Sequence, residues 1–311
     1  MVTDVLLAPA PWNDPQLFGE QVISGLATGS IYALVALAIV LIYRSTDVVN
    51  FAQGEMAMFV TFPMWSLTLA GFPAWTVIFI GIALGFAFGG FIERTIIRPV
   101  EDKPPLSVVV VTLGLFVFLN SIATWIWAQG ELPKVFPTPF DFTSVDVGVA
   151  RVTTHSIGIL VVALIIMAAL YMLFNHTKLG LAMRATAHNP AASKLMGINV
   201  GRMLTLGWAL SAAVGGIAGM LVAPITFLFP GFMLAVLLYA FAAAVFGGLD
   251  SPPGAVVGGF FVGVVENLFG TYTPGEYFGP EMKLPLTLLL LVIVLLFKPA
   301  GLFGHVQTRR V

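Results

Sequence analysis

The sequence contains no cysteine, little charge and few histidines, and each shortage excludes a class of function. Without cysteine there are no disulfides, thiolate metal sites or cysteine nucleophiles. The four histidines are dispersed and form no metal-ligand spacing, and no lysine follows a glycine, which excludes a Walker A phosphate-binding loop. Lysine and arginine are scattered as well, with a formal net charge of -1, so the sequence predicts no nucleic-acid partner.

Apolar residues dominate what remains: 59% of the 311 residues are hydrophobic and only 9% are charged. About a quarter of the residues in water-soluble domains are charged, and a soluble core could not enclose this much apolar surface. The composition therefore predicts an all-α, polytopic transmembrane helical bundle. Crossing the bilayer takes an apolar run of roughly 20 residues, and nine candidate segments can be marked: residues 18–43, 51–70, 73–92, 107–128, 155–175, 203–228, 232–247, 254–270 and 284–298.

The number of spans depends on the second, seventh and eighth segments. Each is short or interrupted by glycine, proline or polar residues, and could dip into the membrane and return. We therefore expect about eight or nine spans. Residues 18–298 would form a single transmembrane domain, between an N-terminal segment, residues 1–17, and a tail, residues 299–311. The N-terminal segment has no lysine or arginine, so it lacks the basic start of a cleavable secretory signal.

The positions of lysine and arginine predict the orientation, because short loops rich in these residues stay in the cytoplasm. An extracytoplasmic N-terminus and a cytoplasmic C-terminus leave only Lys134, Arg151 and Lys283 outside. All the other lysines and arginines would then lie inside: Arg44, Arg94, Arg98, Lys103, Lys178, Arg184, Lys194, Arg202, Lys298, Arg309 and Arg310. The opposite orientation would reverse this asymmetry.

Small residues recur at four-residue spacing on several segments. The stripes are Gly25, Gly29 and Ala33; Gly81, Gly85 and Gly89; and Gly207, Ser211, Gly215 and Gly219. Such stripes let helix backbones approach closely in lipid, where no hydrophobic force drives helices together. We expect them to serve tight packing, and lining of a solute path is the alternative.

The longest basic loop, residues 176–202, contains the pattern of a short helix. Asn189 suits the N-cap, Pro190 the first helical position and Gly197 the left-handed residue after the end. An apolar stripe runs between these caps, formed by Ala191 with Leu195 and Ala192 with Met196. Two helical turns are not stable alone in water. The helix therefore rests on the bilayer or on its own bundle, or it docks a cytoplasmic partner.

Polar residues interrupt the apolar sequence in two places. Asn50, Gln53 and Glu55 lie between the first two segments, and Glu266 and Asn267 follow Gly263 on the eighth. Glu266 is three residues from Gly263 and shares its helical face. A carboxylate in a membrane is costly unless it is paired, protonated or hydrated. We expect these five residues to converge on the route of a solute, and the alternative is that they bond to one another between helices.

Three runs together resemble a known family. They are GLATGSIYALVALAIVLIYRSTDVVNFAQGEMAM, GLAMRATAHNPAASKLMGINVGRM and AFAAAVFGGLDSPPGAVVGGFFVGVVEN, within a match of roughly residues 20–305. In order and spacing they are similar to the permeases of branched-chain amino-acid ABC importers. The resemblance implies a subunit of the bacterial or archaeal cytoplasmic membrane. Its partners would be a second related permease forming a heterodimer, two cytoplasmic ATPases that hold ATP and Mg, and an extracytoplasmic solute-binding protein.

By the same resemblance, residues 176–202 are the segment that couples to the ATPase. The matching positions are Arg184, Asn189, Pro190, Ala192 and Gly197, and Leu195 of the apolar stripe belongs to the same predicted surface. Gln53 and Glu55 stand in the family's F-A-Q-G-E stretch. No cofactor is expected on this chain.

Two other functions remain open from the residues. A self-sufficient secondary transporter or channel would use Glu55 and Glu266 for ion coupling, but it has no need of a capped docking helix. A permease for another small solute, such as urea or a short amide, would show a very similar pattern. No arrangement of catalytic residues predicts an intramembrane enzyme.

Overall fold

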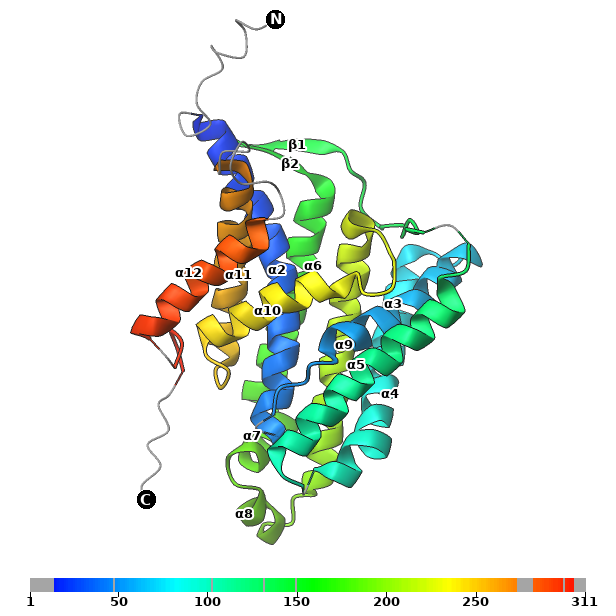
Figure 1. Cartoon of the computed structure of the whole chain (residues 1–311), viewed down its shortest axis with the longest axis vertical. Helices are drawn as coiled ribbons and strands as arrows, with labels where there is room; N and C mark the ends of the chain where they lie inside the picture. Colours follow the sequence, from blue (N-terminus) through cyan, green and yellow to red (C-terminus); the bar gives the residue numbers. More distant parts are fainter. Residues whose placement is uncertain are drawn as a thin grey trace, which may run out of the picture.

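The structure is a computed structural model that describes residues 14–272 apart from 47, 102, 131 and 149, and residues 282–304 apart from 299. It is a bundle of helices with one short β-hairpin (Figure 1). The helices are α2 (Pro15–Thr46), α3 (Gln53–Leu69), α4 (Ala74–Ile92), α5 (Pro105–Trp127), α6 (Thr154–His176), α7 (Lys178–His188), α8 (Pro190–Leu195), α9 (Val200–Thr226), α10 (Met233–Gly247), α11 (Pro252–Tyr272) and α12 (Lys283–Phe297). After α4 the chain continues through a π-helical turn, Glu93–Ile97, and a 3-10 turn, Arg98–Val100.

A helix occupies each of the nine predicted segments, so the prediction of an all-helical, multi-pass bundle is confirmed at that level. Within the described residues, six helices are long and apolar enough to cross a membrane: Pro15–Thr46, Ala74–Val100, Pro105–Trp127, Thr154–His176, Val200–Thr226 and Pro252–Tyr272. The eighth segment, expected to be weak, is therefore long enough.

The three shorter helices at predicted segments leave the span count open. α3 has 17 residues, and α10 and α12 have 15 each. Fifteen residues rise about 22 Å in an α-helix, less than the roughly 30 Å of a hydrocarbon core. Nine full spans, and the orientation, therefore stay predictions.

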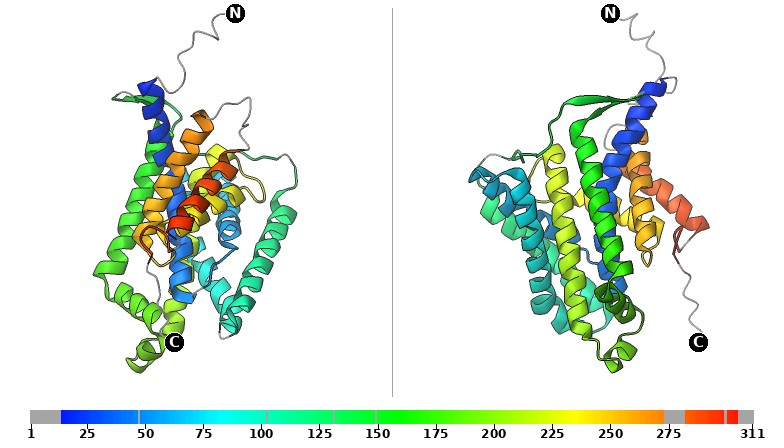
Figure 2. Two further views of the ribbon diagram at one scale, coloured as in Figure 1. Left: turned by 60° about the vertical axis from the view of Figure 1, so that its left-hand side comes forward. Right: turned by 180° about the vertical axis from the view of Figure 1, so that it is seen from behind.

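The centre of the bundle consists of α2 and α9. In each, 89% of the most apolar window is buried, against 28–33% in α4, α5, α6 and α11. A helix that is apolar on all sides belongs inside a bundle or in lipid. Figures 1 and 2 show α3, α4 and α5 on one side of this pair and α11 and α12 on the other. The outer helices thus present apolar surface to the surroundings, as lipid requires.

The small-residue stripes lie in contacts between helices, and at several positions the backbones themselves meet, which supports their predicted packing role. A Cβ added to Gly25 would lie 2.7 Å from Cα of Val264 on α11, and one on Gly259 would meet the backbone of Ala33 on α2. On α4, a Cβ at Gly85 would lie 2.9 Å from Cα of Ala213 on α9. Any larger side chain would push these helices apart.

The antiparallel hairpin of β1 (Ser144–Val147) and β2 (Ala150–Thr153), in the α5–α6 connection, was not predicted. Asp146 and Arg151 face each other across it and form an ion pair of 3.1 Å. The backbone N–H of Arg151 donates to the carboxylate of Glu20 on α2. The hairpin lies at the opposite end of the molecule from α7 and α8 (Figure 1).

Both ends of the predicted transmembrane domain differ in detail from the expectation. α2 begins at Pro15, inside the predicted N-terminal segment, with Asp14 accepting from the N–H of Gln16. In the predicted tail, the N–H groups of Leu302 and Phe303 donate to the carbonyls of Phe246 and Gly247 at the end of α10. The described part of the tail therefore packs on the bundle. Residues 1–13, 273–281 and 305–311 lie outside the described residues.

Candidate functional site

The segment between α6 and α9 contains two capped helices. The Thr177 side chain accepts from the N–H of Gly180 and begins α7, and Asn189 accepts from the N–H of Ala192 at 2.9 Å and begins α8. Pro190 follows the cap, and Gly197 has φ +80°. The predicted caps of the short helix are confirmed. α7 was not predicted, and its residues were expected to form part of a loop.

The apolar stripe of α8 faces outward. Leu195 is 90% exposed and Met196 82%, whereas Ser193 on the opposite side is only 5% exposed. α8 lies at the extreme end of the molecule, beyond α7 (Figure 1). Nothing in the described part of the chain covers these two side chains, so α8 offers a small apolar surface on a fixed support.

That support reaches the bundle through α7. Arg184 of α7 lines a small cavity together with Arg44 and Leu41 of α2, Leu204 of α9 and Pro252 of α11. At Gly180 an added Cβ would meet the backbone of α6. α7 therefore lies against α2, α6 and α9.

The first group of polar residues forms a closed network at the start of α3. Asn50 accepts from the N–H of Ala52 and donates to Oε1 of Gln53 at 3.3 Å. The Gln53 amide donates to the carbonyl of Ser211 on α9 at 3.1 Å, and Oγ of Ser211 donates to Oε1 of Gln53 at 3.0 Å. Oγ of Ser211 also lies 2.8 Å from the carbonyl of Ala38 on α2. Asn50, Gln53 and Ser211 are all buried, and their bonds join α2, α3 and α9.

Glu55 lies on another side of α3, and its hydrogen-bond partner belongs to α5. Its Oε2 accepts from Nδ2 of Asn120 on α5 at 3.2 Å. The side chain of Glu55 is buried. Asn120 also lies close to Gly231, where an added Cβ would be 3.5 Å from Nδ2. The pair thus connects α3 and α5 near the beginning of α10.

The second group lies on α11, toward α2 and α10. The hydroxyl of Tyr32 on α2 donates to Oε2 of Glu266 at 2.9 Å, and the Tyr32 ring stacks on Tyr239 of α10 with centroids 4.9 Å apart. Glu266 and Asn267 are partly exposed. Asn267 donates to the carbonyl of Gly263 on its own helix. Glu266 does share the face of the small-residue stripe, as its spacing predicted.

The five predicted pathway residues therefore form separate sets. Among the described residues, no hydrogen bond or ion pair joins the Asn50, Gln53 and Glu55 region to Glu266 or Asn267. Sequence reasoning missed their partners Tyr32, Asn120, Ser211 and Tyr239. Only Ser211 carried a signal, as a member of a small-residue stripe.

A further polar cluster at the end of α4 was not predicted. The carboxylate of Glu93 is buried and accepts two bonds from Arg98, at 3.1 Å from Nε and 3.0 Å from Nη2. The same Nη2 donates to the carbonyl of Gly201 and to Oγ1 of Thr205 on α9. Residues five apart do not face each other in an α-helix, but the π-helical turn brings Glu93 and Arg98 together.

These features define a class: a multi-pass membrane protein, with membrane-length helices around two buried central ones. The model of the family described as "Branched-chain amino acid transport system / permease component" matches residues 21–295, and the chain belongs to this family. It is accordingly a transport permease subunit of ABC importers and not an enzyme.

Individual relatives agree with the family match over nearly the whole chain. The high-affinity branched-chain amino acid transport system permease protein LivH of Salmonella typhimurium is 32% identical, over 94% of this chain and 98% of the relative. The corresponding permease protein BraD of Pseudomonas aeruginosa is 30% identical, over 94% and 97%. A probable branched-chain amino acid transport permease protein LivH of Methanocaldococcus jannaschii is 28% identical, over 92% and 93%.

Proposed function

We propose that this chain provides half of the membrane passage for branched-chain amino acids in an ABC importer. Its partners are a second related permease that forms a heterodimer with it, two cytoplasmic ATPases that hold ATP and Mg, and an extracytoplasmic solute-binding protein. The names of the relatives support the solute, because the chain matches them over almost its full length. The observation that carries the ATPase partner is the exposed apolar end of α8.

α8 suits docking because it is fixed on one side and uncovered on the other. A six-residue helix is not stable alone in water. Its caps, Asn189 and Gly197, and its buried Ser193 hold it in place. Leu195 and Met196 then remain as an apolar pair that a groove on the ATPase would cover. Arg184 and Ala192 complete the predicted coupling segment, and α7 carries its movement to the bundle.

The topology of the proposal is nine spans with the N-terminus outside and the C-terminus inside. In this orientation α7 and α8 face the cytoplasm, and the β1–β2 hairpin faces the solute-binding protein at the other end. The lysine and arginine asymmetry supports this direction. The 15-residue helices α10 and α12 would cross where the bilayer is locally thinned or where a second permease packs against them.

The proposed solute route runs past Glu266 and Asn267, the partly exposed members of the predicted set. The Glu266 carboxylate could receive the ammonium group of an amino acid, since its described hydrogen bond, from Tyr32, is made through a single oxygen. The ammonium group of Lys283 on α12 lies against Gly270, one turn further along α11, and could receive the carboxylate. The rings of Tyr32 and Tyr239 would face the apolar side chain.

The first predicted group has a supporting role in this proposal. Asn50 and Gln53 are buried and bonded to neighbours on each side, so they hold α2, α3 and α9 together. Glu55 holds α5 through Asn120. Substitution of these residues would change transport through the packing of the bundle.

The docking proposal is tested with Leu195→Asp, made in the assembled importer. Val145→Asp on β1 is the matched control, because Val145 is an exposed apolar residue at the opposite end of the molecule. We expect Leu195→Asp to abolish copurification of the ATPase and solute-stimulated hydrolysis, while Val145→Asp leaves copurification unchanged. ATPase binding that survives Leu195→Asp together with Met196→Asp would show that α8 is not the docking element.

The solute and the energy source are tested by uptake of labelled leucine into vesicles that contain the complex, binding protein and ATP. We expect uptake to require the ATPase, and unlabelled isoleucine or valine, but not urea, to compete with leucine. Glu266→Gln should lower leucine uptake at least tenfold without changing thermal stability, whereas Gln53→Ala should lower both. Uptake that persists without the ATPase would indicate a secondary transporter, and urea uptake would indicate a different solute.

A further inference from the structure

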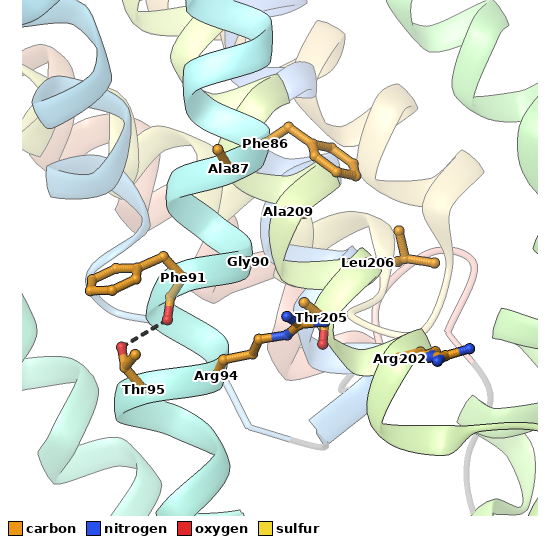
Figure 3. A pocket seen from close by; sticks show the side chains of 10 residues that line it. All are labelled: Phe86, Ala87, Gly90, Phe91, Arg94, Thr95, Arg202, Thr205, Leu206 and Ala209. Carbon is orange, nitrogen blue, oxygen red and sulfur yellow. Dashed lines mark hydrogen bonds between the residues drawn. The ribbon is translucent and has the colours of Figure 1, made fainter.

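A groove on the outside of the bundle follows the line where α4 meets α9. It has a volume of about 590 Å³, within the range of small-molecule sites. Figure 3 shows its lining: Phe86, Ala87, Gly90, Phe91, Arg94 and Thr95 from α4 and its π-helical extension, and Arg202, Thr205, Leu206 and Ala209 from α9. Arg202 is the last residue of the predicted coupling segment, 176–202, and the other nine lining residues lie outside that segment and outside the proposed solute route.

The groove exists because the two helices touch on one edge only. A Cβ at Gly89 would meet Ala212 and the backbone of Trp208, so the backbones are in close contact there. At Gly90, the next residue, an added Cβ would be 3.4 Å from Cγ2 of Thr205 and 3.8 Å from Cβ of Ala209. The helices therefore diverge on the outer face and leave space between them.

One end of the groove is cationic. Arg94 and Arg202 come from different helices, both are exposed, and neither forms an ion pair with a described carboxylate. The neighbouring carboxylate of Glu93 cannot neutralise them, because Arg98 already takes both of its oxygens. Two uncompensated positive charges thus remain at the ends of membrane-type helices.

The remainder of the groove is apolar and open to the surroundings of the bundle. Phe86 and Phe91 are exposed, and only a third of the apolar window of the α4 segment is buried. In a multi-pass membrane protein this surface adjoins acyl chains. A water-soluble anion would use the arginines but leave the apolar part uncovered.

We propose that this groove binds an anionic glycerophospholipid, with its phosphate between Arg94 and Arg202 and an acyl chain along Phe86, Gly90 and Leu206. Arginine is suited to phosphate because it presents several N–H donors in a planar fork. Basic pockets at the ends of membrane helices are the usual sites of anionic headgroups. The hydroxyl of Thr95 donates its proton to the carbonyl of Phe91, so the arginines are the groups that would bind the phosphate. The proposal rests on membrane insertion, and does not depend on the solute.

The test measures binding of phosphatidylglycerol to the purified full chain in detergent by native mass spectrometry, with phosphatidylcholine of the same acyl chains as the neutral comparison. We expect Arg94→Gln with Arg202→Gln to weaken phosphatidylglycerol binding roughly 30-fold, as for the loss of two cationic contacts. Lys178→Gln with Lys194→Gln is the control, because it removes the same charge from exposed residues of α7 and α8.

Two further variants separate the headgroup from the acyl chain and from misfolding. Replacement of both arginines by lysine should retain most of the binding, which shows that the chain remains folded. Gly90→Leu should fill the groove and weaken binding with both arginines present.

Three results would overturn the proposal: equal loss in the lysine-to-glutamine control, no loss in the arginine-to-glutamine pair, or equally tight binding of glycerol phosphate without acyl chains. The last would indicate a free-anion site. The assay contains no solute, ATPase or second permease, so its failure is independent of the proposed transport function.

Discussion

Arg98→Ala is expected to destabilise the bundle strongly, because it leaves a carboxylate buried without its cation. The side chain of Glu93 is 1% exposed and accepts two bonds from Arg98. Arg98 also bonds to the carbonyl of Gly201 and to Thr205. The substitution therefore removes every described link that this arginine makes between the end of α4 and the start of α9.

Removing one partner of a buried ion pair costs about 3–5 kcal/mol. The Arg98 side chain is 39% exposed, so water can partly reach the abandoned carboxylate and the lower value applies. We expect Arg98→Ala to lower the free energy of unfolding by about 3 kcal/mol. The ion pair of Arg151 with Asp146 has a similar distance, 3.1 Å, but its side chains are 64% and 74% exposed. Arg151→Ala should therefore cost about 0–1 kcal/mol.

The assay is denaturant unfolding of the detergent-solubilised chain, followed by tryptophan fluorescence. Adding Glu93→Gln to Arg98→Ala should recover at least about 1 kcal/mol, since a neutral amide has a smaller desolvation cost and the two sites are coupled. The reasoning is refuted if Arg98→Ala is no more harmful than Arg151→Ala, or if the second substitution recovers nothing.

Three further predictions follow from the backbone contacts and from exposure. Gly259→Ala should cost about 1–3 kcal/mol in thermal unfolding, because its Cβ meets the α2 backbone. Gly114→Ala on α5, where an added Cβ has nothing within 4 Å, should be neutral or stabilising by about 0.5–1 kcal/mol. Equal effects of the two substitutions would contradict the packing role of the stripe. Gly197→Val places a β-branched residue at φ +80° and should cost about 1–2 kcal/mol locally. We expect this variant to bind the ATPase more weakly in a pull-down while its membrane insertion stays normal. Unchanged binding would argue against coupling by α8. Single cysteines at Val135 and Met196, both well exposed, should react with an impermeant reagent from opposite sides of the membrane, and labelling from one side would refute the topology.

Much of the fold could be predicted because membrane insertion imposes strong local rules. Every backbone group in lipid must be bonded within its own segment, so apolar runs become helices wherever they occur. The stripe of Gly25, Gly29 and Ala33 was recognisable because spacing fixes the face of a helix. The cap of α8 was recognisable because Asn189, Pro190 and Gly197 each satisfy a local requirement of the backbone. The hairpin was not predicted, since its strands have four residues each and depend on contact with α2.

The polar residues show where local rules end. Asn50, Gln53, Glu55 and Glu266 could be marked as unusual, because any polar group in an apolar segment needs a partner. Their partners lie far away in the sequence: Ser211 is 158 residues from Gln53, and Tyr32 is 234 residues from Glu266. Only the packing of the helices decides which of these groups meet, and it separates the two predicted groups into different networks.

The sequence by itself determined that this protein is a helical membrane permease, which apolar segments are helices, which faces carry the small-residue stripes, and where the short capped helix lies. Hydrophobic length, small-residue spacing and backbone capping are properties of consecutive residues, and they act before the chain is packed. The tertiary structure alone decided that α2 and α9 are central, that Leu195 and Met196 are uncovered, and that Arg94 and Arg202 share a groove. These relations depend on helix rotation and on close contacts between distant segments, which no local pattern encodes.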